Sequence, residues 1–195
     1  MTALLSMAAF ALACSISPGP VNVVALSAGA QHGLAASLRH VTGATVGFTI
    51  LLLLVGLGLH ELLARCPTLI DLVRWAGVAF LLYMAYKLAT DDGKLGAGNL
   101  TQRPSFTHGA AMQWLNPKAW LASLAGMGAY AADGGSRLVW QFTVVYFVIC
   151  YLSIASWAYA GTFLRRYLQD PARVKVFNRV LAVLLAGSAL YLLLE

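Results

Sequence analysis

The sequence has little charge. Only 10% of its 195 residues are charged and 60% are hydrophobic, whereas ordinary soluble domains are about 25% charged. A soluble globular domain is therefore excluded. A helix needs about 20 apolar residues to cross a bilayer, and at that length the apolar runs account for nearly the whole chain. The sequence predicts one integral membrane domain over residues 1–195.

The sequence has no basic residue near its start and only three cysteines, and both features argue against other classes of protein. No Lys or Arg precedes Arg39, so the first apolar run is not expected to be a cleaved signal peptide. Cys14, Cys66 and Cys150 are odd in number and far apart, which argues against a disulfide framework and against a metal site. No cofactor is expected. Cytoplasmic loops explain the net charge of +6 more simply than nucleic-acid binding does.

Long apolar runs are what the sequence does contain. They predict an all-α integral membrane bundle of six transmembrane helices, at about residues 3–30, 41–63, 69–89, 108–131, 138–161 and 176–194. Nine basic residues lie in or beside the connections after the first, third and fifth helices: Arg39, Lys87, Lys94, Arg103, Arg165, Arg166, Arg173, Lys175 and Arg179. Three lie in the other connections: Arg65, Arg74 and Arg137. Because Lys and Arg favour the cytoplasmic side, both termini are predicted to lie outside.

The predicted cytoplasmic loop at about 91–107 divides the chain into two halves, about 1–90 and 108–195. Each half has an odd number of predicted helices, so related halves would have opposite orientations in the membrane. Inverted halves of this kind place a substrate near the bilayer midplane, on broken helices at corresponding positions. Breaks are predicted in the first and fourth helices.

The first predicted break is the stretch Ser17-Pro18-Gly19-Pro20-Val21-Asn22. Each proline lacks an N–H, so the carbonyls of Cys14 and Ile16 lose their i+4 donors. Such a break is tolerated in a membrane only where it is buried in protein or lines a wet cavity. Ser17 followed by Pro18 is typical of a helix start, which would put Pro20 at the third helical position.

The second predicted break is Asn116-Pro117-Lys118, an N-cap followed by proline at the first helical position. Two half-helices starting at the breaks would point their positive ends at the membrane interior and attract a carboxylate. The carbonyls freed at Cys14, Ile16 and Gln113 would suit an ammonium. Together these groups match the backbone of an amino acid. The predicted substrate-binding residues are Ser17, Pro18, Gly19, Pro20, Asn22, Gln113, Asn116, Pro117 and Lys118.

Two of these residues have an alternative interpretation. A lysine near the centre of a span costs about 2.5–3.5 kcal/mol to insert, which favours a function for Lys118. The alternative is that its side chain snorkels to the cytoplasmic face. Asn22 would either contact the substrate or make an interhelical hydrogen bond worth about 0.6 kcal/mol.

Other small and polar residues are predicted to serve in packing or at interfaces. The pairs Gly29/Gly33 and Gly43/Gly47 allow close helix approach, within one bundle or in a homodimer. Trp114 is predicted to be an interfacial anchor. Trp157 is predicted to be a packing residue, with a position lining a cavity as the less favoured alternative. His32, His40, His60 and His108 are predicted at loops or interfaces, with proton coupling as the less favoured alternative.

Acidic residues are absent from the predicted membrane core, because all seven fall in loops or near helix ends. A cationic substrate side chain would meet Lys118 and two positive helix ends, and like charges repel strongly at low dielectric. The substrate is therefore predicted to be a small neutral amino acid. The same absence removes the usual proton-carrying carboxylate and leaves Lys118 as the available proton carrier.

With these motifs the chain resembles the lysine exporter (LysE/RhtB) family of bacterial amino-acid exporters. The resemblance rests on residues 17–22, on Asn116-Pro117-Lys118-Ala119, on the Trp75-Ala76-Gly77 to Tyr83 stretch and on the glycines at 29, 33, 43, 47 and 56. It covers the whole chain and is greatest for the short members that export cysteine and O-acetylserine. It implies proton-driven efflux of amino acids or close derivatives across the bacterial inner membrane. Together with the neutral substrate predicted above, this favours the cysteine, O-acetylserine, homoserine or threonine class.

Other classes of function are weighed against this one. A passive small-solute channel needs no site that holds one substrate, and Lys118 beside two positive helix ends opposes cation conduction. An exporter of a basic amino acid is opposed by the same charges. A membrane-embedded enzyme would need a nucleophile with a base, or paired cysteines, and neither appears. A structural subunit would give the breaks no purpose. The expected partners are an amino acid, protons and the lipid bilayer, without nucleic acid.

Overall fold

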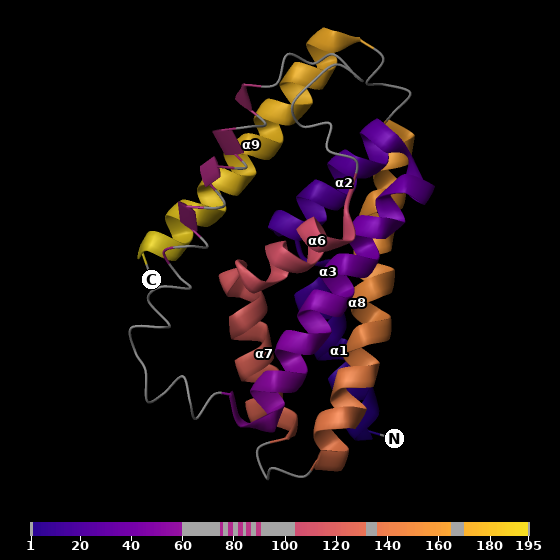
Figure 1. Cartoon of the computed structure of the whole chain (residues 1–195), viewed down its shortest axis with the longest axis vertical. Coiled ribbons are helices and arrows are strands. Elements are labelled where there is room, and N and C mark those ends of the chain that lie inside the picture. Colours follow the sequence, from indigo (N-terminus) through magenta and orange to yellow (C-terminus); the bar gives the residue numbers. More distant parts are fainter. Residues whose placement is uncertain are drawn as a thin grey trace.

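The structure, a computed structural model, describes residues 2–59, 104–131, 136–164 and 170–194, together with isolated positions between 75 and 90. All regular structure in this part of the chain is helical (Figure 1). The helices are α1 (Thr2–Ile16), α2 (Pro20–His32), α3 (Leu34–Leu54), the short π-helix η1 (Val55–Leu59), α6 (Phe106–Trp114), α7 (Pro117–Tyr130), α8 (Ser136–Leu164) and α9 (Pro171–Leu194). The prediction of an all-α chain is confirmed for these residues.

Helices α3 and α8 form the centre of the bundle. Helix α3 packs against α6 and α8, and α8 also packs against α1 and α2. The main core lies between them and includes Leu51 and Val41 of α3, Met112 of α6 and Phe142 of α8. Helix α9 runs along the outside of the bundle (Figure 1) and packs on α2, where Leu181 and Ala182 meet Val23.

Two stretches of the described chain are each long and apolar enough to cross a membrane, Leu34–Gly58 and Ser136–Leu164. A third crossing is present if Ala3–Ile16 and Pro20–His32, which meet at a bend of 64°, form one span. Large apolar side chains on these helices face outward, as a lipid-facing surface requires; Leu152 is 62% exposed. The described residues therefore form a multi-pass helical membrane protein. Most of the predicted third helix, most of the 91–107 loop, and His60 and Cys66 lie outside the described residues.

The predicted start of the second span at residue 41 is wrong. Helix α3 begins at Leu34, and Gly33 alone connects it to α2. Gly33 has φ 80° and ψ 170°, a conformation that glycine adopts without a steric penalty. Its N–H donates to the carbonyl of Gly29 at 3.0 Å and closes α2. Gly33 is thus the turn between two helices, rather than half of a packing pair.

Glycines bring several helix backbones into direct contact. A Cβ at Gly29 of α2 would overlap the carbonyl of Ala158 on α8, and a Cβ at Gly43 of α3 would overlap the backbone of Phe106 on α6. Gly47 meets Ala110 of α6 in the same way. Of the two predicted uses of these glycines, the structure shows packing within one bundle.

Adding one methyl group at a glycine tests this close packing. We expect Gly29→Ala to destabilise the protein by about 1–3 kcal/mol, because the helix backbones must separate. At about 2–4 °C per kcal/mol for a chain of this size, thermal unfolding in detergent would measure the change. The matched control is Gly128→Ala, since a Cβ there meets no atom within 4 Å. Equal melting temperatures for the two variants would show that the α2–α8 contact is not tight.

Candidate functional site

The first break lies between α1, which ends at Ile16, and α2, which begins at Pro20. The residue before a proline is disfavoured in helical conformation, and both Ser17 and Gly19 precede prolines. Gly19 accordingly has the extended angles φ −166° and ψ 172° and is the N-cap of α2. The prediction that the second half-helix starts at Ser17-Pro18 is therefore wrong. Pro20 occupies the first helical position, and no side chain caps the helix.

The hypothesis that the carbonyls freed by the prolines bind an ammonium requires these carbonyls to be unpaired. In the structure all three are paired. The Cys14 carbonyl accepts a hydrogen bond from Ser17 Oγ at 3.1 Å. The Ile16 carbonyl accepts one from the indole Nε1 of Trp157 on α8 at 3.0 Å. The Gln113 carbonyl accepts one from the Asn116 N–H at 3.2 Å. That hypothesis is corrected accordingly: each freed carbonyl already has a donor from the protein.

Asn22 holds the two sides of the first break together. Its Nδ2 donates to the carbonyl of Ser15 at 2.8 Å and to that of Ser17 at 2.9 Å. The side chain is buried. The structure thus shows the predicted hydrogen bond, made across the bend of its own span, and contact of Asn22 with the substrate stays a prediction.

The second break lies between α6 and α7, with Asn116 as N-cap and Pro117 at the first helical position, as predicted. The Asn116 Oδ1 accepts from the Lys118 N–H at 3.2 Å, and the Asn116 carbonyl accepts from the Ala119 N–H at 2.9 Å. Because proline has no N–H, Asn116 pairs all the N–H groups at the start of α7. The N-terminus of this helix is therefore closed to an anion.

Trp114 lies at the second break and is not an interfacial anchor. Its indole Nε1 donates to the carbonyl of Gly47 on α3 at 3.1 Å. Its own carbonyl, which the break leaves without a helical donor, accepts from the indole of Trp120 at 2.8 Å. Indole donors thus pair a carbonyl at each of the two breaks.

The start of α2 differs from the start of α7. Its first backbone hydrogen bond runs from the Val23 N–H to the Gly19 carbonyl at 2.9 Å. The N–H groups of Val21 and Asn22 precede that bond, so they belong to the donors that a helix N-terminus leaves without an intrahelical acceptor. Of the two helix N-termini predicted to attract a carboxylate, that of α2 has backbone N–H groups left to donate to one.

Lys118 joins the two breaks. Its Nζ donates to the Oγ of Ser17 at 2.7 Å and to the Ser17 carbonyl at 3.1 Å, with the Pro18 carbonyl at 3.4 Å. The ammonium thus lies against the first break instead of extending to a membrane face. All three partners are neutral oxygens. In the described part of the chain the one carboxylate is that of Asp170. Its Oδ2 lies 3.9 Å from the Nε of Arg173 on α9.

A cavity of about 40 Å³ opens where the breaks meet. Five of the predicted site residues line it: Gly19, Asn22, Gln113, Asn116 and Lys118. Ser17, Pro18, Pro20 and Pro117 are not among the lining residues and shape the breaks around it. At about 10–15 Å³ for each water, the cavity holds roughly three waters. It must widen to admit an amino acid.

The remaining wall of the cavity comes from residues outside the predicted substrate-binding set: Cys14, Ser15, Val21, Phe48, Ala119, Ala122, Tyr146, Cys150 and Ile154. The rings of Phe48 and Tyr146 pack with centroids 4.5 Å apart. The Oγ of Ser15 is buried and has no hydrogen-bond partner among the described residues. These side chains belong to α1, α2, α3, α7 and α8, and apart from Val21 and Ala119 no local motif marks them.

Comparison with known proteins agrees with the resemblance found in the motifs. The family model for LysE type translocators matches residues 12–195, a range that contains both breaks and the cavity. Proteins of Escherichia coli and Shigella flexneri, each described as a cysteine/O-acetylserine efflux protein, are 31% identical over 183 residues. The match covers 92% of this chain and 92% of each of those proteins. No solved structure matches the chain.

Removing an indole donor tests whether the protein must pair the broken backbone. We expect Trp157→Phe to destabilise the protein by about 1–3 kcal/mol, because the Ile16 carbonyl loses its donor where lipid offers none. The same substitution at Trp140, which is 53% exposed on α8, is the control and should leave the melting temperature unchanged. Thermal denaturation followed by circular dichroism compares the two. A Trp157→Phe variant as stable as Trp140→Phe would contradict the assignment.

Proposed function

The chain belongs to the LysE family of translocators, and we propose that it exports small neutral amino acids or their derivatives from the cytoplasm. Members of this family are transporters, and its relatives of 31% identity are efflux proteins, so the chain is not an enzyme. The observation that carries the proposal is the position of Lys118. Its ammonium bridges two helix breaks beside a cavity and the uncapped start of α2.

The carboxylate of the substrate would bind between α2 and Lys118. The Val21 and Asn22 N–H groups and the α2 dipole favour an anion at this end. Lys118 adds a full positive charge whose present partners are neutral oxygens. A carboxylate would replace those oxygens with a charge-assisted hydrogen bond, which is roughly twice as strong as one between neutral groups.

The ammonium of the substrate would bind at the second break. Gln113 lines the cavity, and its side chain is 5% exposed. A side-chain amide oxygen accepts hydrogen bonds from an ammonium. Gln113 therefore takes the role that the sequence assigned to the freed carbonyls.

The side chain of the substrate would face Ser15, Phe48 and Tyr146. The packed rings and the cavity of about 40 Å³ favour a small group. The buried Ser15 hydroxyl, which has no hydrogen-bond partner in the described part of the chain, suits a substrate with a hydroxyl, thiol or ester oxygen. No described carboxylate lines the cavity to pair with a basic side chain. Cysteine, O-acetylserine, homoserine and threonine fit these properties better than lysine.

We propose alternating access for the transport cycle, in one domain of six transmembrane helices in the bacterial inner membrane, with both termini outside and a proton gradient as the driving force. The order helix, break, helix, long helix occurs twice, as α1-α2-α3 and as α6-α7-α8. From the middle of the bundle α2 and α7 extend towards opposite ends (Figure 1), as inverted halves require. Gly29, Gly43 and Gly47 pack inside the chain, so we propose no homodimer through them.

Efflux from proteoliposomes tests the proposal. Vesicles preloaded with labelled serine, cysteine, O-acetylserine or lysine should release the three neutral substrates at least tenfold faster than lysine. Lys118→Met should slow serine efflux about 10- to 150-fold, because a hydrogen bond to a charged group contributes about 1.5–3 kcal/mol.

Lys175→Met removes the same charge from an exposed position on α9 and is the matched control. It should transport within twofold of the wild type. Efflux of no amino acid would refute the exporter, and lysine moving as fast as serine would refute the substrate class. An unimpaired Lys118→Met variant would refute the carboxylate site.

A further inference from the structure

His40 is a buried imidazole that has no hydrogen-bond partner among the described residues. It is 1% exposed, and neither Nδ1 nor Nε2 is paired with any described residue. The prediction that it lies in a loop or at an interface is wrong, because α3 begins at Leu34 and carries His40 into the bundle. A buried polar group without a partner is costly to retain. The substrate site does not use it, since it does not line the cavity.

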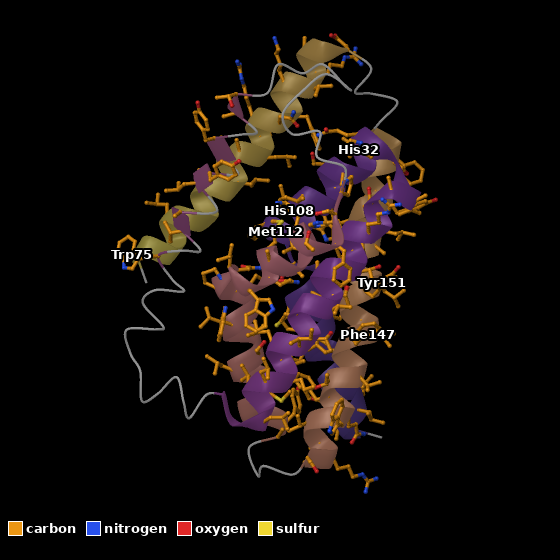
Figure 2. All side chains as sticks on the ribbon, in the orientation of Figure 1. His32, Trp75, His108, Met112, Phe147 and Tyr151 are labelled. Atoms are coloured by element: carbon orange, nitrogen blue, oxygen red, sulfur yellow. The ribbon has the colours of Figure 1, made fainter. Side chains whose placement is uncertain are left out.

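The nearest titratable group is a second histidine. The ring of His108 on α6 lies with its centroid 6.0 Å from that of His40. Figure 2 shows His108 within the bundle, one turn before Met112 on the same helix. The two rings lie at the seam of α3 and α6, where Gly109 touches the backbone of His40 and Ala44. The seam is too tight there for even a Cβ.

No other described titratable group faces His40. From α6 the ring faces His108, and from α2 it faces the backbone of Val21, without hydrogen-bond geometry. Lys118 of α7 and Tyr146 and Cys150 of α8 line the cavity instead. Histidine is the side chain whose charge changes most readily near neutral pH. Two imidazoles this close in a tightly packed seam cannot both be charged without strong repulsion.

We propose that His40, together with His108, binds the proton that drives transport. This inference rests on the proposed function as an amino-acid exporter. One proton adds to a ring nitrogen of the pair and makes it cationic. The charge draws water into the α3–α6 seam and separates the helices, and loss of the proton closes the seam again. Lys118, the proton carrier favoured by the sequence, is instead held by the oxygens of the first break.

The location of the pair links the proton to the substrate. Gln113 follows His108 by five residues on α6, a rise of about 7.5 Å, and Phe48 follows His40 by eight residues on α3, a rise of about 12 Å. Both Gln113 and Phe48 line the cavity. A shift of α6 at the histidines therefore moves a wall of the substrate site. The proton and the amino acid still bind at separate places.

Proteoliposomes of the full chain test the pair by comparing two modes of serine movement. Net efflux is measured with and without a pH gradient, acidic outside, and serine exchange is measured at equal pH on both sides. Exchange needs substrate binding and helix movement, but no net release of a proton. For the wild type we expect the gradient to accelerate net efflux at least fivefold. His40→Gln and His108→Gln should reduce that acceleration below twofold and keep exchange within twofold of the wild type.

His32→Gln is the matched control, because His32 is the last residue of α2 and Figure 2 shows it apart from His108. This variant should keep both the acceleration of net efflux by the gradient and the exchange of serine. A His40→Gln variant that still responds fully to the gradient overturns the inference, as does one that loses exchange as well. If His40→Gln does not fold, His108→Gln decides by the same criteria. A wild type that exchanges serine without any response to the gradient overturns the inference and leaves the exporter intact; a wild type that moves no serine refutes the exporter itself.

Discussion

The structure depends on one constraint: backbone groups that a helix break leaves unpaired must find partners inside the protein, because lipid offers none. The prolines at 18, 20 and 117 free three carbonyls, and each receives a donor: a serine hydroxyl, an indole or a backbone N–H. The donors to the first break include Trp157 on α8 and Lys118 on α7. Satisfying the broken helix is thus what draws distant helices together around the cavity.

The sequence predicted the breaks because proline acts locally. The lost N–H and the restricted residue before proline are properties of two or three neighbours, and the Asn116-Pro117 start was found as expected. The partners of the freed carbonyls were not predictable in the same way. Trp157 lies 141 residues from Ile16, and nothing beside it in sequence identifies its acceptor. A residue before a proline avoids the helical conformation, and this applies to Gly19 as well as to Ser17. The predicted helix start at Ser17-Pro18 left Gly19 out and was therefore wrong.

The same distinction between local and distant causes applies to the site. Lys118 could be identified because a charge inside an apolar run is conspicuous, and Gln113 because Pro117 frees its carbonyl. Ser15, Phe48 and Tyr146 are ordinary residues of membrane helices, and only the packing of α1, α3 and α8 brings them to the cavity. His40 was placed too near the surface because hydropathy does not register a connection as short as Gly33, which lets α3 begin at Leu34.

Gly33 also limits how the bundle deforms. A link of one residue has only two soft torsions, φ and ψ, and the Gly33 N–H is bound to the Gly29 carbonyl. Helices α2 and α3 are therefore coupled through Gly33 alone. In the proposed proton-driven movement, a displacement of α3 at its seam with α6 would turn α2 about Gly33. The other end of α2, the uncapped N-terminus beside Lys118, would then move farthest because it is farthest from Gly33.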